Sequence, residues 1–539
     1  MPSTHSAIQN RIMGSELEFG FSVTDKNYYN MIPTFIIERA NKLLIPREFY
    51  NRPCLLNQAR FAVDGRVPEY KTPECLGPRE LSLHEAAAVE LIGSATNAIK
   101  AAERMTDKTF SLHKSDRNCE VKEIKNDSKD FYCPTNSFGS CHSNYLTYRR
   151  IEFNDIKNFL TPFLLTRWIC IGNGWFEIGP KNKLRFLLSQ RAGLIGKPNN
   201  NTSSGDTRVK PLISTKDESL ADEKIWRRYH DVSGNQNMSQ WQIYLKHAAM
   251  DLMFMMIETP NFLTLLPPIV DKRFKEYEHL NPSFENSQFY LTAITDFFNA
   301  DIFGEKTVRL ANGVWWSALD FQRYFISEVE RYKRENRGPF SDEREAGLQF
   351  WIKITDAIER KDLAFLARYL DWAAILYYFV TPALNRLGEE LDSVLDVNKK
   401  GVTYNRKIET KNGEVKILSY IHNLIIEYAN IATEKSPYGL LTKKGLIEQM
   451  FLPEEIFEAQ HTPPKKTRAA CREELMLWVK ERPNMIVYNE QWIIIVLEEN
   501  GKKFNVLFKD PYCRHEEKTD GVYSHFNPQE LLNTGIPCQ

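Results

Sequence analysis

The 539-residue sequence predicts an α+β fold, and three features of its pattern support that class. Near the N-terminus, strand-like segments at residues 11–23 and 59–72 flank residues 31–44, where apolar side chains recur with helical spacing. Long helical patterns then occupy the middle of the chain, and strand-like alternation returns near the C-terminus. Strands and helices that are segregated along a chain in this way are typical of α+β proteins.

The elements in the middle of the chain follow from spacing and turn residues. Apolar residues three and four positions apart predict helices in four further segments, at residues 81–105, 239–258, 317–335 and 345–380. Asn412-Gly413 lies between two short alternating segments. An Asn-Gly pair in that setting predicts a β-hairpin.

The C-terminal part differs in character from the rest. After the proline-containing stretch at residues 461–470, residues 484–510 read as two strands joined at Asn500-Gly501. This change predicts two domains. We expect a large α+β domain and a small α+β domain, over residues 1–442 and 443–539 respectively.

The composition limits the classes of function. Lysine plus arginine and aspartate plus glutamate number 70 each, so the net charge of zero gives no support for nucleic-acid or membrane partners. No apolar run reaches the ~20 residues of a membrane-spanning helix, and the N-terminus lacks the apolar segment of a signal peptide. The nine cysteines are scattered without a CxxC pair, which we interpret as reduced thiols in a cytoplasmic protein.

Four acidic residues in the two N-terminal strand-like segments are candidate metal ligands. Glu16 and Glu18 are two positions apart, so a strand points both carboxylates to the same face of a sheet. Like charges that close together repel unless a cation lies between them. Asp64 and Glu69 add two acids, and Mg²⁺ takes carboxylate oxygens together with substrate phosphates. The alternative is a half-exposed strand whose acids are solvated.

Basic and polar residues further along the chain are candidates for binding a nucleotide. Arg191 follows an apolar run, and the next segment concentrates side chains suited to phosphate groups: Arg208, Lys210, Lys216, Arg227, Arg228, His230 and Asn237. No Walker-type phosphate loop occurs in the sequence. The alternative is that some of these cations form surface ion pairs with the acidic residues between them.

Several stretches resemble, in order, the motifs of one protein family. The two acidic segments read "GSELEFG" and "ARFAVDGRVPEYKTPEC", and "NSFGSCHSNYL", "LSQRA", "TRVKPLISTKDESLAD" and "RRYHDVSGNQNMSQ" follow them. "TPPKKTRA" and "FKDPY" complete the series, which runs from about Arg11 to Tyr512. The sequence is thereby similar to the Pup ligase and depupylase family. Members of that family attach prokaryotic ubiquitin-like protein to lysines or remove it, and they are related to glutamine synthetase.

The resemblance implies a fold, two cofactors and several residue roles. The implied fold is a glutamine synthetase-like domain, with a curved antiparallel sheet packed by helices, that binds ATP and Mg²⁺. Glu16 and Glu69 fall where magnesium ligands lie, and we expect Glu18 to join them. Asp64 falls where the catalytic aspartate lies. The number of metal ions stays open, because a tyrosine of the family pattern is Ala62 here.

The resemblance also implies where the nucleotide binds. Arg191, Arg208 and Lys210 fall in segments that line the phosphates, and Trp492 falls where a tryptophan of the small domain lies beside the nucleotide. From the basic segment we add three further expected nucleotide ligands, which are Lys216, His230 and Asn237.

Two reactions fit such a site. As a ligase, the protein phosphorylates the C-terminal glutamate of a Pup-like modifier, and Asp64 deprotonates the lysine of a target protein that attacks it. As a depupylase-type amidohydrolase, it uses Asp64 to activate water or to attack the amide. Depupylases carry a long extra loop before the second acidic strand, whereas residues 21–58 are short and helix-like, so we expect a ligase, acting as a monomer. The sequence also leaves open a regulator with a degenerate site and a small-molecule carboxylate–amine ligase.

Overall fold

The computed structural model describes most of the chain. The described ranges are residues 7–23, 32–45, 54–65, 67–105, 110–116, 139–191, 195–201, 210–259, 308–309, 315–335, 337–338, 340–395, 401–411, 413–482, 484–512 and 536–537. Of the residues singled out above, Arg208 and Asn412 lie outside these ranges.

The main sheet has the spatial order β10-β11-β12-β7-β1-β4-β3, and β5 pairs with the start of β1. All neighbouring strands are antiparallel except β10 and β11, which are parallel. Strand β1 lies between β7 and β4, so its two glutamates are inside the sheet rather than at its edge. The strands are β1 Ile12–Glu18, β3 Arg60–Asp64, β4 Val67–Lys71, β5 Cys75–Leu76, β7 Cys141–Tyr148, β10 Ile195–Asn200, β11 Lys210–Ser214 and β12 Trp226–Asp231.

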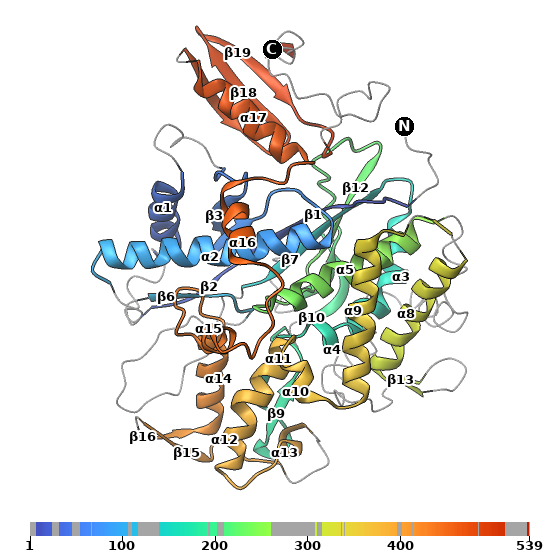
Figure 1. Ribbon diagram of the computed structural model, residues 1–539, viewed down its shortest axis with the longest axis vertical. Helices are drawn as coiled ribbons and strands as arrows, with labels where there is room; N and C mark the ends of the chain where they lie inside the picture. The colour runs from blue at the N-terminus through green and yellow to red at the C-terminus, as the bar shows by residue number, and fades with distance from the viewer. Residues whose placement is uncertain are drawn as a thin grey trace.

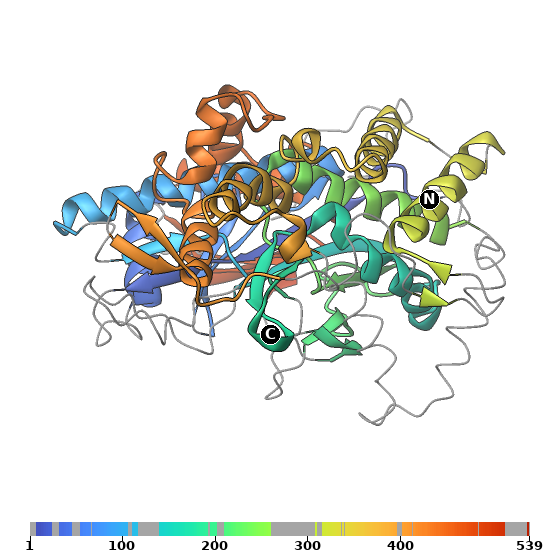
Figure 2. The ribbon, with the colours of Figure 1, turned by 90° about the horizontal axis from the view of Figure 1, so that it is seen from below.

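Helices form a layer on one face of this sheet (Figures 1 and 2). The long helix α2 (Pro78–Ala102) and the buried helix α5 (Gln240–Ile257) contact each other there, and α1 (Ile32–Leu44) packs beside α2. The methionine-rich run of α5 lies wholly in the core. A sheet with helices on one face confirms the α+β class predicted from the sequence.

The predicted helices and strands agree with the structure, with the following changes. The segment expected over residues 345–380 is divided into α9, α10, α11 and a π-helical turn at Ile375–Val380. Both N-terminal segments expected as single strands are divided. Residues 11–23 are interrupted at Phe19, and the second part, β2, pairs with β6. Residues 59–72 form the antiparallel pair β3 and β4. The remaining bounds of this large unit are β2 Gly20–Val23, β6 Phe110–His113, α3 Phe153–Thr166, α4 Trp168–Ile171, β8 Trp175–Ile178, β9 Leu184–Leu187, β13 Val308–Arg309, β14 Trp315–Trp316, α8 Ala318–Arg334, α9 Asp342–Glu359, α10 Leu363–Leu366, α11 Asp371–Ala374, α12 Thr381–Asn385, α13 Asp392–Leu395, β15 Lys407–Thr410, β16 Gly413–Lys416, α14 Ile417–Tyr428, α15 Pro437–Lys443 and α16 Pro453–His461.

A small unit at the C-terminus lies at the top of Figure 1. Its described elements are α17 Arg468–Lys480, β17 Met485–Glu490, β18 Ile494–Glu499, β19 Lys502–Leu507 and β20 Ile536–Pro537. It has its own apolar core, which includes Leu475 and Ile495, whereas Leu441 and Ile447 pack in the core of the large unit. The predicted turn at Asn500-Gly501 joins β18 to β19, and both residues have positive φ, as a tight hairpin turn requires. Residues 484–510 therefore form three strands rather than two.

A buried ion cluster fastens the small unit to the main sheet. Glu74, which directly precedes β5, accepts from Arg468 Nε at 2.6 Å and from Arg472 at 3.0 and 2.6 Å, and both arginines lie on α17. Burial alone would raise the pKa of Glu74, but the charges of Arg472 and Arg468 outweigh it and hold that pKa well below its usual range. The cluster therefore stays ionised across the neutral pH range.

The structure describes five of the nine cysteines. Cys54, Cys75, Cys141 and Cys170 are free and buried. Cys471 is disulfide-bonded, so the expectation of reduced thiols throughout is wrong at that residue.

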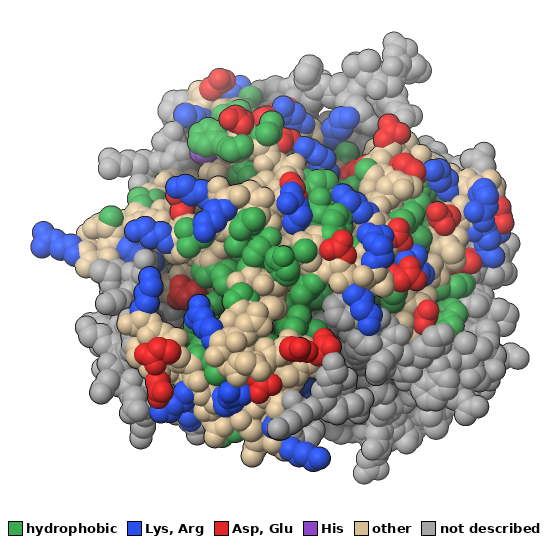
Figure 3. Space-filling model, turned by 60° about the horizontal axis from the view of Figure 1, so that its bottom comes forward, with side chains coloured by type: hydrophobic (Ala, Val, Ile, Leu, Met, Phe, Trp, Pro, Cys, Tyr) green, Lys and Arg blue, Asp and Glu red, His purple; other side chains and the backbone are tan. Residues whose placement is uncertain are grey.

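Within the described part of the chain, no helix combines the length and apolarity that crossing a membrane requires. On the face that Figure 3 shows, basic and acidic side chains are interspersed.

Glu74→Gln tests the attachment of the small unit. Removing one partner of a buried ion cluster leaves the other charges uncompensated and costs about 3–5 kcal/mol. We expect hydrogen exchange in α17 to become faster by a corresponding factor, measured by mass spectrometry on the full chain. The matched control is Glu448→Gln, which removes a surface ion pair with Arg368 and should cost less than about 1 kcal/mol. Equal protection of α17 in both variants would contradict the role of Glu74.

Candidate active site

The acidic residues of β1, β3 and β4 lie on the sheet face opposite the helices. In the register of the sheet, Glu18 on β1 is directly opposite Glu69 on β4, and Glu16 is directly opposite His142 on β7. Asp64 ends β3, two residues beyond Ala62, which pairs with Glu69. Because paired residues share a face, these strands bring together acids that are far apart in the sequence.

Glu18, Asp64 and Glu69 form one group. Each offers a carboxylate oxygen, and these oxygens all lie within 4.8 Å of one another. Glu69 is buried and Asp64 is exposed, so the group opens to solvent on the side of Asp64. Lys71 Nζ lies 2.6 Å from Glu69, and the Ser140 hydroxyl donates to Glu18.

The pKa of Glu69 reflects its crowded position. Burial and the negative charge of Glu16 raise this pKa to about 7, and Lys71 offsets only part of the effect. Without a cation, Glu69 is therefore partly protonated at neutral pH. A divalent cation between these carboxylates would remove both the repulsion and the proton.

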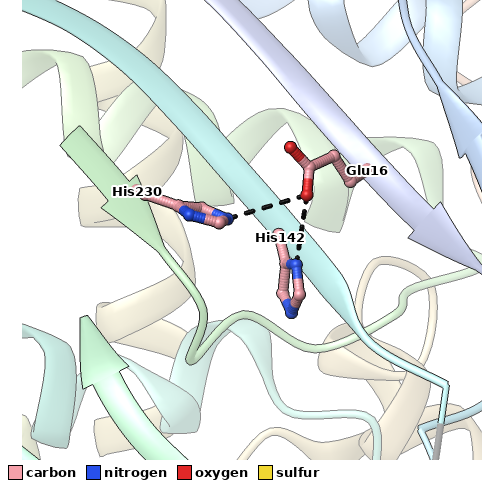
Figure 4. Close-up of side chains that lie close together, drawn as sticks. All are labelled: Glu16, His142 and His230. Carbon is pink, nitrogen blue, oxygen red and sulfur yellow. Dashed lines mark hydrogen bonds and ion pairs between the residues drawn. The ribbon is translucent and has the colours of Figure 1, made fainter. Parts of the chain in front are cut away.

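Glu16, His142 and His230 form a second group beside the first, and Figure 4 shows both imidazole rings pointing at the Glu16 carboxylate. His142 Nδ1 donates to Glu16 at 3.2 Å, and His230 Nε2 lies 3.7 Å from the same oxygen. Asn144 Nδ2 donates to the other oxygen at 3.2 Å, and Arg228 lies 3.7 Å from it.

The pKa values of the two histidines are shifted in opposite directions. Burial opposes the positive charge on His142, but its hydrogen bond to Glu16 outweighs burial and raises the pKa of His142. Burial and the charge of His142 lower the pKa of His230 to about 3, so His230 is neutral at pH 7. Burial alone would raise the pKa of Glu16, yet the hydrogen bond from His142 and the positive charges of His142 and Arg228 hold it well below its usual range.

Both groups fit a divalent cation. Three carboxylates are the oxygen set that Mg²⁺ prefers, and a carboxylate with two imidazoles also suits Mn²⁺ or Zn²⁺. The two ring nitrogens of His230 are buried and have no hydrogen-bond partner among the described residues. A buried polar atom left in that state is costly, and a bound cation or ligand would satisfy it.

Arg191 and Lys210 provide positive charge next to the first group. Burial and the charge of Arg191 lower the pKa of Lys210, while the charge of Glu18 acts in the opposite direction, so the three charges are near enough to influence one another. Arg191 is buried, and its Nε has no hydrogen-bond partner within the described ranges. Two cations that repel each other beside a metal-binding group suit the charge of nucleotide phosphates.

A pocket connects the acidic face to the small unit. Its lining includes Glu16, Asn144, Arg228 and Trp492, together with the apolar residues Ile12, Leu146, Leu220 and Pro511. Arg60 of β3 lies 4.4 Å over the Trp492 ring, and Arg472 donates to the Trp492 carbonyl at 3.1 Å. The flat tryptophan face and the apolar lining suit an aromatic ring, such as a nucleobase.

The structure does not bring two of the predicted residues to this site. The Lys216 side chain is exposed beyond the end of β11 and pairs with Glu218 at 3.0 Å. Asn237 is buried elsewhere and donates to the Ile171 carbonyl and to Asp371. Both residues are near site residues in the sequence, but the chain turns their side chains away. Arg208 is outside the described residues.

Sequence reasoning also missed residues that the site contains. These residues are His142, Asn144, Lys71 and Arg60. The available signal was the i, i+2 spacing of His142 and Asn144, which repeats that of Glu16 and Glu18. It is weak because only the register between strands reveals that the two pairs are neighbours.

The fold and this face define an α+β protein of the glutamine synthetase-like class. Two solved structures share the fold. The crystal structure of the complex between prokaryotic ubiquitin-like protein Pup and its ligase PafA has a TM-score of 0.71 at 22% identity, covering 99% of this chain and 92% of that one. The structure of the Pup ligase PafA in complex with ADP has a TM-score of 0.64 at 22% identity, covering 90% and 92%.

Sequence comparison gives the family. A model of the Pup-ligase protein family matches residues 11–495. The Pup–protein ligase of Nocardioides sp. is 29% identical over 514 residues, which are 94% of this chain and 98% of the relative. That of Kribbella flavida is 29% identical over 517 residues, 95% of this chain and 98% of the relative. The chain belongs to the Pup-ligase protein family, and the resemblance drawn from its motifs is confirmed.

The pKa of Glu69 gives a testable pH dependence. Because Glu69 must lose its proton to bind a cation, the affinity of the nucleotide-free protein for Mg²⁺ should rise roughly tenfold from pH 6 to pH 8. Isothermal titration calorimetry in buffers of different ionisation enthalpy would also detect the released proton. Glu69→Gln should remove the pH dependence, and the surface variant Glu389→Gln should keep it. An affinity for Mg²⁺ that is flat over this range would contradict the assignment of Glu69.

Proposed function

We propose that this chain is an ATP-dependent ligase that joins the C-terminal glutamate of a small Pup-like modifier to a lysine amine of target proteins. Its family, its relatives named Pup–protein ligase and its structural likeness to PafA support this reaction. The observation that carries the proposal is the intact group of Glu18, Asp64 and Glu69, with Arg191 and Lys210 beside it.

The residues of the acidic face have different roles in the proposed reaction. Bound ATP and Mg²⁺ supply the phosphoryl group that activates the modifier carboxylate and the positive charge that stabilises its transfer. Glu18 and Glu69 would hold one cation, and Glu16 with His142 and His230 would hold a second. Arg191 and Lys210 neutralise phosphate charge. Trp492, with Arg60 over its ring, would offer an aromatic surface to the nucleobase.

Asp64 acts as the general base. Its side chain is exposed at the end of β3, so a lysine amine on the surface of a target protein can reach it. The amine is protonated at neutral pH and must lose a proton before it attacks the activated carboxylate. A carboxylate within the cation-binding group can accept that proton and attract the positively charged lysine at the same time.

The connection before β3 favours the ligase over the depupylase. Between the end of β2 at Val23 and the start of β3 at Arg60, helix α1 buries Ile36 and Ala40 in the core. A helix that packs in this way uses much of the short connection. We further propose two domains in a cytoplasmic monomer, a catalytic domain over residues 1–442 and a small domain over residues 443–539, whose first part, up to α16, packs against the large unit.

Asp64→Asn tests the proposed base. The variant keeps the size of the side chain but accepts a proton poorly, so conjugate formation should fall at least about 100-fold. ATP binding should stay within about twofold. The assay incubates the protein with Mg·ATP, a Pup-like modifier ending in glutamate and a lysine-bearing target, and follows a heavier product on a gel. Glu454→Gln, on the exposed surface of α16, serves as the control.

The same assay distinguishes the ligase from the competing functions. Release of the modifier from a preformed conjugate, without net ATP consumption, would indicate the hydrolase instead. Tight nucleotide binding with neither activity would indicate a regulator. An Asp64→Asn variant with near wild-type turnover would remove Asp64 from its role.

Trp492→Ala tests the nucleotide contact. Loss of the aromatic face should raise the KM for ATP about three- to tenfold, because stacking and cation–π contacts contribute roughly 0.5–1.5 kcal/mol. Lys216→Gln is the matched comparison, since the Lys216 side chain is exposed and paired with Glu218. We expect its KM to stay within about twofold. Equal effects of the two variants would argue against the pocket beside Trp492 as the nucleotide site.

A further inference from the structure

A second charged cluster lies beneath the main sheet, on the face that α2 and α5 cover. Its centre is Glu85 of α2, whose side chain is fully buried. Ser15 Oγ donates to Glu85 Oε1 at 2.7 Å, and His247 Nε2 donates to the same oxygen at 2.8 Å. Two buried lysines complete the cluster, with Lys246 Nζ at 3.5 Å and Lys114 Nζ at 3.4 Å from the carboxylate.

This cluster contacts the strands next to the residues of the candidate active site. Ser15 immediately precedes Glu16 on β1. Lys246 Nζ donates to Cys141 Sγ at 3.2 Å, and Cys141 immediately precedes His142 on β7. Tyr145 OH donates to His247 Nδ1 at 3.0 Å, and Tyr145 immediately follows Asn144.

Strand geometry makes this adjacency significant. Successive side chains of a strand point to opposite faces of the sheet. Ser15, Cys141 and Tyr145 therefore point to the helices, and Glu16, His142 and Asn144 point to the acidic face. Each of these last three residues belongs to the Glu16 group, in which His142 and Asn144 both hydrogen-bond to Glu16. On the helix-covered face, β1 and β7 are thus linked to the Glu85 carboxylate through Ser15, Cys141 and Tyr145. Each of these three residues is next to a member of the Glu16 group in the sequence.

Stability alone is a poor account of this cluster. Buried ionic groups often contribute little to stability, because apolar residues of similar volume fill the same space without a desolvation cost. Charged hydrogen bonds do fix the relative positions of the groups that they join. A site for a divalent cation needs that fixity, because ligand positions that are wrong by about 1 Å weaken binding and catalysis.

We propose that Glu85 is a positioning residue for the candidate active site. It holds β1 and β7 from the face that α2 and α5 cover. Glu16, His142 and Asn144 thereby keep the spacing that a divalent cation and nucleotide require. The proposal rests on the proposed function, since it assumes that the Glu16 group binds a cation in the reaction. Glu85 touches neither nucleotide nor reacting atoms. Its effect passes through Ser15, Lys246 and His247.

Three variants test the proposal in the full chain. Glu85→Gln keeps the shape of the central side chain, while Ser15→Ala and Tyr145→Phe each remove one hydroxyl and leave the buried ionic groups in place. The measurements are the affinity for Mg²⁺ with ADP by calorimetry, the rate of conjugate formation as a function of Mg²⁺ concentration, and the midpoint of urea unfolding. The matched control is Asp251→Asn, which disturbs a different buried cluster, with Arg11 and Arg344.

The expected results distinguish a positioning role of Glu85 from a role in protein stability alone. Glu85→Gln should weaken Mg²⁺ affinity about 10–100-fold, the range typical of residues that orient metal ligands, and Ser15→Ala and Tyr145→Phe should weaken it by a smaller factor. High Mg²⁺ should restore most of the rate. Asp251→Asn should lower the unfolding midpoint without changing the Mg²⁺ dependence. If Glu85→Gln does not fold, the Mg²⁺ affinities of Ser15→Ala and Tyr145→Phe test the proposal.

Two negative results are distinguishable. Wild-type Mg²⁺ affinity and Mg²⁺ dependence in Ser15→Ala, Tyr145→Phe and any folded Glu85→Gln would overturn the positioning role and leave the proposed function intact. Failure of the wild-type protein itself to bind Mg²⁺ with ADP would overturn the proposed function, and the positioning role with it.

Discussion

Repulsion among carboxylates on one face of a sheet is the constraint on which the rest of the structure depends. Glu16, Glu18, Asp64 and Glu69 come from three neighbouring strands, and the register of the sheet places them together. The protein balances part of this charge with its own groups. His142 and Arg228 offset Glu16, and Lys71 offsets Glu69 only in part, which leaves a surplus of negative charge for a cation.

The two faces of the main sheet have complementary roles. One face gathers the acids and opens toward the small unit, where Glu74 holds α17 against the strands. The other face is packed by α2 and α5 and contains the Glu85 cluster, which ties together the strands that carry the acids. A crowded anionic surface is tolerable only on a rigid support, because otherwise the strands would separate to relieve the repulsion. The acidic face of the sheet therefore depends on the packing of the opposite face.

The sequence predicted the elements and the acidic pairs but not their neighbours. The i, i+2 spacing of Glu16 and Glu18 and the periodicity of α5 are local signals, and both were confirmed. The position of His142 beside Glu16 depends on a pairing between strands more than a hundred residues apart, which no local pattern encodes. Lys216 and Asn237 lie away from the site for the opposite reason. They are close to site residues along the chain, yet a turn and a buried hydrogen bond direct their side chains elsewhere.

The central claim is that the carboxylates of Glu18, Asp64 and Glu69 surround a cation that binds the phosphates of a nucleotide. The most direct test is a crystal structure with Mn²⁺ and a non-hydrolysable ATP analogue, with the metal located by its anomalous scattering. We predict an anomalous peak within about 2.3 Å of Glu18 or Glu69 oxygens, with phosphate oxygens completing the coordination and Arg191 and Lys210 beside them. A structure in which metal and nucleotide bind away from this face, and the three carboxylates contact neither, would contradict the claim.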